Sequence, residues 1–236
     1  MADIALPYED RRQAGRVLAA RLAHCLGRPE LLVLALPRGG VAVALEVARA
    51  LQAPLDIFVV RKLGLPGHEE YAMGAIASGG VRVMTPLHGL SVSPKALARV
   101  VAREQAELLR REQLYRGQRP AVSLAGRSVI VVDDGLATGA TMRAAVLAIA
   151  QQHPASLVVA VPVGAKEACQ ALRLQGQADE VICAATPEPF RAVGLWYKKF
   201  PQTSDDEVRA LLEEAGSVQN ADQAPGTVPS DVPSDG

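Results

Sequence analysis

Short apolar runs alternate along the chain with longer segments in which hydrophobic positions recur at the period of a helix. Nearly continuous apolar runs are typical of parallel strands that are buried on both faces of a sheet. The runs cover residues 31–37, 55–62, 129–134, 156–164 and 180–184, and the helical segments cover 8–26, 41–52, 94–116, 140–153 and 165–175. This alternation predicts an α/β fold with an open, mainly parallel central sheet and helices on both faces.

Two segments depart from the alternation. Residues 63–85 are rich in glycine and contain only short β-like pieces, and such an excursion inside a compact domain is usually a mobile functional loop or a hairpin. Residues 217–236 contain three prolines, a duplicated Val-Pro-Ser-Asp sequence and few large apolar side chains, so we expect a disordered tail. The remaining chain, 1–216, is expected to form one domain.

Charge and length narrow the class of protein. The chain has 236 residues, 49% of them hydrophobic, and its 25 Lys+Arg residues balance 25 Asp+Glu residues. A globular chain of this length can bury a full core. The charge balance argues against nucleic acid as a partner, because bulk electrostatic binding usually requires a basic excess. It leaves room for a local site that binds a small anion.

Cysteine usage and the N-terminal segment bear on location. The three cysteines, Cys25, Cys169 and Cys183, have no CxxC spacing, which argues against a disulfide framework and against a Cys-based zinc site. The acidic first ten residues contain no apolar signal core, and no apolar run approaches the length of a membrane helix. We therefore expect a cytoplasmic protein without a membrane partner.

The segment 129–141, VIVVDDGLATGAT, carries the main chemical signal. A buried strand delivers Asp133 and Asp134, here called the Asp pair, to its carboxyl end, where open α/β sheets bind ligands. Adjacent carboxylates require a metal, cations or hydroxyl donors, and the vicinal hydroxyls of a ribose provide two donors. The small residues that follow enter a helix N-terminus, where backbone amides and the helix dipole favour a phosphate. These residues are Ala137, Thr138, Gly139, Ala140 and Thr141.

Other nucleotide-binding motifs do not fit this segment. A Walker loop requires a lysine after its second glycine, and the dinucleotide fingerprint G-x-G-x-x-G is absent from this turn. An isolated Asp-Asp-Gly could simply end a strand and cap a helix, but the thirteen consecutive positions together favour a ribose 5-phosphate site.

The segment resembles the phosphoribosyl pyrophosphate (PRPP) signature of the type I phosphoribosyltransferases, with four apolar residues, two acids and a T-G-x-T loop. The supporting features cover most of residues 8–212, and the pattern is most similar to a broad group of bacterial phosphoribosyltransferases whose acceptor is not evident from sequence. The resemblance implies transfer of ribose 5-phosphate from PRPP to a nitrogenous acceptor, which we expect to be a nucleobase, with release of pyrophosphate. It also implies Mg²⁺, held mainly by the substrate with a contribution from the Asp pair, in an enzyme of nucleotide metabolism.

Two basic segments acquire roles from this resemblance. Arg38, Gly39 and Gly40 follow the first predicted strand, and adjacent glycines allow unusual backbone angles and close approach to a ligand. The resemblance makes this segment the pyrophosphate loop. Arg61 and Lys62 end the second predicted strand at the same sheet edge, so we expect them to balance pyrophosphate charge and to act in catalysis with the Asp pair. An ordinary turn and a solvated strand end are the respective alternatives.

Two further regions match parts of the resembled family. Residues 63–85 occupy the place of its flexible catalytic loop, and residues 186–203 occupy the place of the hood that covers the acceptor. Four of the eight aromatic residues lie within 190–200, and stacking on a flat ring is a common way to hold a base. Trp196 and Tyr197 are our candidates for acceptor binding. The alternative is that the aromatic rings seal the core beneath a C-terminal helix, expected over 205–215.

The acceptor and the use of the site remain open at this stage. Ala137 stands where enzymes for 6-oxopurines typically carry an additional Asp, which counts against hypoxanthine or guanine as the acceptor. The main alternative function is a regulator that binds PRPP without turnover, and intact Arg38, Arg61 and Lys62 favour an enzyme over it. Homodimers are common in the resembled family.

Overall fold

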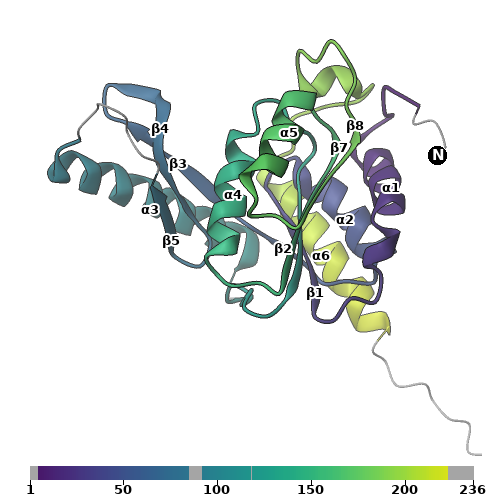
Figure 1. The fold of residues 1–236 in the computed structure, drawn as a ribbon. Helices are drawn as coiled ribbons and strands as arrows, with labels where there is room; N and C mark the ends of the chain where they lie inside the picture. Colours follow the sequence, from purple (N-terminus) through teal and green to yellow (C-terminus); the bar gives the residue numbers. More distant parts are fainter. Residues whose placement is uncertain (1–4, 85–91, 118, 223–236) are drawn as a thin grey trace, which may run out of the picture.

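The apolar runs form a five-stranded parallel sheet in the order β2-β1-β6-β7-β8 (Figure 1). The structure is a computed structural model and describes residues 5–84, 92–117 and 119–222. The inner strands β1, β6 and β7 are paired on both sides and are almost entirely buried, which explains their continuous apolar sequences. The strands are β1 (Leu31–Ala35), β2 (Leu55–Ile57), β6 (Ser128–Val132), β7 (Ser156–Val163) and β8 (Glu180–Ala185).

Helices cover both faces of this sheet, and alternate residues of β1 point into two separate cores. Leu31, Val33 and Ala35 pack with α1, α2 and α6, whereas Leu32 and Leu34 pack with α4 and α5. Figure 1 shows these two groups of helices on opposite sides of the strands. The predicted α/β architecture with helices on both faces is confirmed. The helices are α1 (Arg11–Arg21), α2 (Gly40–Ala50), α4 (Ala140–Ala150), α5 (Lys166–Gln175) and α6 (Asp205–Asp222), with short 3₁₀ turns η1 (Ala23–Cys25) and η2 (Val193–Trp196).

A second, antiparallel sheet projects to one side of the central sheet together with helix α3 (Pro94–Arg116) (Figure 1). It consists of β3 (Val60–Leu65), β4 (His68–Ala77) and β5 (Val81–Met84) in that order. The region from 63 to 84 is therefore built of paired strands, which is the hairpin alternative of the sequence prediction. Residues 85–91 lie outside the described part of the chain.

The prediction of one strand over 55–62 is wrong. The chain leaves the parallel sheet after Ile57, and Val60–Leu65 pairs instead with β4. Residues 57–60 are Ile-Phe-Val-Val, an unbroken apolar run without glycine or proline, so no local signal marks the change of sheet. Pairing with β4 decides that a separate strand, β3, begins at Val60.

Serine side chains cap the starts of two helices. Ser93 caps α3, because its hydroxyl accepts a hydrogen bond from the Ala96 amide at 3.3 Å. The Ser204 hydroxyl accepts a hydrogen bond from the Glu207 amide at 3.1 Å at the start of α6. Helix α6 continues to Asp222, past the predicted start of the tail at 217, and residues 223–236 lie outside the described residues.

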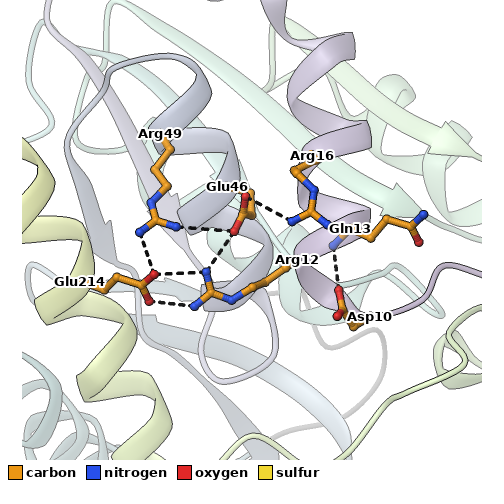
Figure 2. Close-up of polar contacts among 7 residues, drawn as sticks. All are labelled: Asp10, Arg12, Gln13, Arg16, Glu46, Arg49 and Glu214. Atoms are coloured by element: carbon orange, nitrogen blue, oxygen red, sulfur yellow. Dashed lines mark hydrogen bonds and ion pairs between the residues drawn. The ribbon is translucent and has the colours of Figure 1, made fainter.

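An ion-pair cluster fastens the C-terminal helix to the N-terminal half of the chain (Figure 2). Glu214 of α6 accepts hydrogen bonds from Arg12 of α1 and from Arg49 of α2, each at 2.7 Å. Arg12 also donates to Glu46 of α2 at 3.0 Å, and Arg16 lies 3.6 Å from the same carboxylate. The cluster therefore ties three helices together over the α1–α2–α6 face of the sheet.

The structure corrects the interpretation of the cysteines. Cys169 of α5 and Cys183 of β8 form a disulfide, whereas Cys25 is a free, buried thiol. Their Cα atoms lie 6.6 Å apart because α5 returns along the sheet next to β8, a proximity that the sequence spacing does not show. The cysteines therefore no longer support the expectation of a cytoplasmic location. Among the described residues, no helix is long and apolar enough to cross a membrane.

Candidate active site

The Asp pair lies where the sequence predicts, at the carboxyl end of a central strand. β6 is fully buried between β1 and β7, and Asp133 and Asp134 follow its last residue. The Asp133 carboxylate turns back and accepts a hydrogen bond from the Asp134 amide at 2.8 Å. This local bond fixes one carboxylate of the pair at the sheet edge, in the position where α/β sheets bind ligands.

The environment of the Asp pair disfavours negative charge. Burial raises the pKa of Asp133 well above its ordinary value, and the neighbouring Asp134 carboxylate raises it further. Burial also raises the pKa of Asp134, although a hydrogen bond from Arg11 opposes that shift. The two carboxylates are thus incompletely compensated by the protein, as expected of groups that await cations or hydroxyl donors.

The loop after β1 packs directly against the Asp pair. A Cβ atom built on Gly39 would lie 1.9 Å from Oδ2 of Asp134, and one built on Gly40 would lie 2.9 Å from the Asp133 Cα. Glycine is therefore required here for close approach to the acidic loop. The expected unusual backbone angles are absent at Gly39, whose φ is −60°. The Pro37–Arg38 peptide bond is cis, and the half-buried Arg38 side chain lies 3.9 Å from Asp205.

Residues 137–141 form the turn that leads into α4. Gly139 has a φ of +73°, a left-handed conformation that favours glycine, and α4 begins at the next residue. Thr138 and Thr141 are exposed, and the first-turn amides of a helix have no acceptor within the helix. The Ala140 amide donates to the Thr138 hydroxyl at 3.4 Å within the turn. The exposed threonine hydroxyls and the N-terminus of α4 are the groups suited to an anion here.

A cation next to this turn was not predicted. Arg143, in the first turn of α4, donates a hydrogen bond from Nη1 to the Thr138 carbonyl at 2.8 Å. Its guanidinium thus lies beside the candidate phosphate turn. Its position in the sequence, two residues after the T-G-x-T loop, could have indicated this, because the first turn of a helix lies close to the loop that precedes it.

The structure places Arg61 and Lys62 in the second sheet, on β3. Arg61 donates from Nη2 and Nε to one oxygen of the buried Glu104 on α3, at 2.7 and 3.0 Å, and Lys62 is exposed. The expectation that both end a strand of the central sheet is wrong, because that strand stops at Ile57. Their participation in pyrophosphate binding stays a prediction.

The N-terminal segment completes the predicted hood. The Tyr8 amide donates to the Trp196 carbonyl at 2.8 Å, and the Lys198 amide donates to the Tyr8 carbonyl at 2.7 Å. Tyr197 is 5% exposed, and its hydroxyl donates to the Asp134 carbonyl. Its pKa is raised by burial and then by the charge of Asp134. Tyr197 is therefore placed as a support of the acidic loop, while the half-buried Trp196 ring stacks on Phe190 at 6.3 Å.

A cavity of about 320 Å³ lies between the hood and the loop after β1. Its lining is formed by Arg11, Arg38, Gly39 and the segment 200–203. Among the described residues, neither Trp196 nor Tyr197 belongs to this lining. Of the aromatic cluster, Phe200 lines the cavity together with the segment 201–203 that follows it.

Arg11 is the second residue that sequence reasoning missed. Its Nε donates to Oδ2 of Asp134 at 2.8 Å, and its Nη1 donates to the Pro201 carbonyl at 2.8 Å. The guanidinium also lies 3.8 Å above the centroid of the Phe200 ring. In the sequence Arg11 is one of two adjacent arginines at the start of a helix, and nothing local distinguishes it from Arg12.

Comparison with known proteins finds relatives that match most of this chain. Two curated Mycobacterium tuberculosis proteins, from strains CDC 1551 and H37Rv and provisionally named phosphoribosyl transferases, are each 47% identical over 228 residues. Each match covers 92% of this chain and 51% of the relative, so the chain spans about half the length of these relatives. The crystal structure of TT1426 from Thermus thermophilus is 44% identical and superposes with a TM-score of 0.78, covering 88% of this chain and 98% of that protein.

The family is shown by a match over most of the described chain. Residues 8–184 match the phosphoribosyl transferase domain, a range that includes the loop after β1, the Asp pair and the turn into α4. The predicted resemblance is thereby confirmed. The chain belongs to the phosphoribosyl transferase domain family.

Proposed function

We propose that this protein transfers ribose 5-phosphate from PRPP to a nitrogenous acceptor and releases pyrophosphate. The observation that carries the proposal is the meeting of three parts at one sheet edge. The Asp pair follows β6, the turn 137–141 opens α4, and the Arg38–Gly40 loop approaches so closely that a Cβ on Gly39 would collide with Asp134. Groups suited to a diol, a phosphate and a pyrophosphate thus lie close together, which supports the proposal.

Each part of PRPP has a chemically matched partner. The Asp pair accepts hydrogen bonds from the ribose hydroxyls, and the turn 137–141 binds the 5-phosphate through amides and hydroxyls, with the charge of Arg143 beside it. Arg38 and the amides of Gly39 and Gly40 bind the pyrophosphate. In this arrangement we place the anomeric carbon toward the cavity that Arg38 and Gly39 line.

The chemistry follows from this orientation. The bond between the anomeric carbon and the pyrophosphate oxygen breaks, and its electron pair leaves with pyrophosphate. The acceptor nitrogen forms the new bond to carbon and releases its proton to water or to the departing pyrophosphate. Positive charge develops on the sugar near the carboxylates of the Asp pair, and negative charge develops on the leaving group near Arg38. The protein acts by positioning the reactants and by stabilising both charges.

The donor set fits Mg²⁺, which the family resemblance implies. The Asp pair provides carboxylate oxygens that the protein compensates incompletely, and Mg²⁺ binds through few carboxylates together with substrate phosphate oxygens. Asp133 and Asp134 would hold the ion directly or through water. When bound, it neutralises charge on the pyrophosphate.

We further propose that the acceptor enters the 320 Å³ cavity and is a nucleobase, which would make the protein an enzyme of nucleotide metabolism. Ala137 supplies no carboxylate at the turn, and this still counts against hypoxanthine or guanine as the acceptor. Trp196 remains a candidate for acceptor binding from its place in the hood, although the cavity lining favours the segment 200–203. Action in the cytoplasm is part of the same proposal.

The decisive experiment is a mass-spectrometric screen of the full chain with PRPP, Mg²⁺ and a panel of nucleobases and amines. A nucleotide product together with released pyrophosphate is expected, and the Asp133→Asn/Asp134→Asn variant should give none. PRPP binding without a product across the panel would instead favour the regulatory alternative. Absence of PRPP binding by the wild-type chain would contradict both functions.

A further inference from the structure

Arg11 connects three elements that the sequence separates widely. It starts helix α1, pairs with Asp134 at the end of β6, and donates to the Pro201 carbonyl in the hood. Its side chain is 11% exposed, and that of Asp134 is 16% exposed. An ion pair so shielded from water is held in a defined geometry, unlike a flexible surface pair.

The surroundings hold Arg11 in this position. The Tyr8 amide and carbonyl are hydrogen bonded to hood residues 196 and 198, and the Asp10 carboxylate caps α1 by accepting from the Gln13 amide at 2.8 Å. The Phe200 ring lies under the guanidinium. The centroid of the Tyr197 ring lies 4.8 Å from the centroid of the Phe200 ring. Arg11 is therefore aimed at Asp134 by the helix, the N-terminal segment and the hood together.

We propose that Arg11 is a positioning residue of the ribose site, which holds the Asp134 carboxylate by Oδ2 and leaves its remaining lone pairs for the ribose hydroxyls. The inference rests on the proposed function, because it assigns a support to the same site. A carboxylate offers about four lone-pair positions, of which Arg11 Nε takes one. The same guanidinium offsets the charge that the second carboxylate adds beside Asp133.

Arg11 also lines the cavity with Arg38, which suggests a competing role for its guanidinium. Direct binding of the pyrophosphate would then be its contribution. The two roles predict that replacing Arg11 weakens affinity for different halves of the substrate. Ribose 5-phosphate reports on the Asp pair and the turn 137–141, whereas inorganic pyrophosphate reports on the Arg38 loop.

The test measures calorimetric affinities of the full chain, with Mg²⁺, for PRPP, ribose 5-phosphate and inorganic pyrophosphate. Arg11→Gln should weaken ribose 5-phosphate and PRPP by about tenfold or more, as for loss of a charge-assisted hydrogen bond, and should leave pyrophosphate affinity unchanged. Arg11→Lys, which keeps the charge without the planar guanidinium, should recover part of the loss. Arg12→Gln is the matched control on the adjacent residue and should leave all three affinities unchanged.

Thermal unfolding of the same proteins guards against a purely structural effect. Arg11→Gln should lower the melting temperature less in an Asp134→Asn background than in the wild type, because its partner charge is already gone. Equal affinities of Arg11→Gln and wild type for ribose 5-phosphate would overturn the inference while the proposed function stands. A loss confined to pyrophosphate would overturn it in favour of direct binding. Failure of the wild type to bind PRPP would contradict the proposed function itself.

Discussion

Two adjacent arginines at the start of α1 enter ion-pair networks with opposite consequences for their acidic partners. Arg12 donates to Glu214 at 2.7 Å in the partly exposed cluster of Figure 2, and this hydrogen bond is the main cause that lowers the pKa of Glu214. Arg11 donates to Asp134 at 2.8 Å, but burial outweighs the bond and the pKa of Asp134 is raised. Similar contacts therefore favour the charged form of Glu214 but only partly offset the cost of burying the charge of Asp134.

We interpret the network around Glu214 as structural and the one around the Asp pair as part of the proposed ligand site. In the cluster around Glu214, several arginines pair with the carboxylates, and these pairs fasten helices. At the Asp pair, charge is concentrated where the fold provides little compensation, which is the arrangement expected of a ligand site. Variants in the two networks should accordingly move affinity and stability in different directions.

The largest effect is expected from replacing the acidic partners of the site. Asp133→Asn with Asp134→Asn should abolish PRPP binding, because amides lose the negative charge and part of the acceptor capacity that the ribose hydroxyls require. Isothermal titration calorimetry with Mg²⁺ measures the effect. Unchanged affinity would remove the assignment of the Asp pair. Glu214→Gln, in the other network, serves as the control and should bind PRPP as the wild type does.

The close contact between the two loops of the site gives the next largest effect. Gly39→Ala would place a methyl group 1.9 Å from Oδ2 of Asp134, so one of the loops must move. We expect destabilisation of about 1–3 kcal/mol by overpacking, together with weaker PRPP binding. Gly216→Ala in α6 is the control, because its Cβ meets no described atom within 4 Å. It should be neutral or stabilise the helix by about 0.5–1 kcal/mol.

The pH dependence of stability tests the electrostatic cost at Asp133. Because its pKa is raised in the folded protein, the folded state retains the proton to higher pH than the unfolded state does. Protonated Asp133 therefore stabilises the folded state fully at pH below its pKa in the unfolded chain, about 4. This stabilisation is lost as pH rises through the pKa of Asp133 in the folded protein. Without ligand or Mg²⁺, Asp133→Asn should therefore gain melting temperature over wild type as pH rises from 4 to about 8. A constant difference across this range would contradict the raised pKa.

The smallest effect is expected in the cluster of Figure 2. Arg12→Gln removes a donor to Glu214, whose side chain is 35% exposed, and one to the more shielded Glu46, which keeps Arg16 and Arg49 nearby. A loss of about 1 kcal/mol in the free energy of unfolding is expected, measured by urea denaturation and reduced at high salt. A large loss of PRPP affinity in this variant would contradict the interpretation that Arg12 is structural and that only Arg11 supports the ligand site.

Local sequence patterns predicted most of the fold because burial in a parallel sheet leaves a direct mark on composition. The central strands around Leu31–Ala35 and Ser128–Val132 are apolar at almost every position, and helix α3 begins and ends at the predicted residues. The break after Ile57 left no such mark, since both strands that it separates are apolar at the junction. Pairing with β4, a tertiary event, decided it.

The candidate site divides in the same way. The Asp pair and the turn 137–141 are contiguous, so their chemistry could be inferred from residue type and order. Arg11 and the segment 200–203 come from opposite ends of the described chain and meet only because the N-terminal segment pairs with the hood. Tyr197 was named as an acceptor candidate from its ring, but burial and its bond to the Asp134 carbonyl place it under the loop.

The amino-acid sequence alone determined the family, the parallel sheet and the acidic loop at its edge, because each depends on residues that are neighbours in the chain. Tertiary structure decided which arginine of an identical pair serves the site. The helical turn directs Arg11 toward Asp134 and Arg12 toward Glu214, on different sides of α1. Successive residues on a helix point about 100° apart, so a difference of one position selects between two environments that only folding brings to the helix.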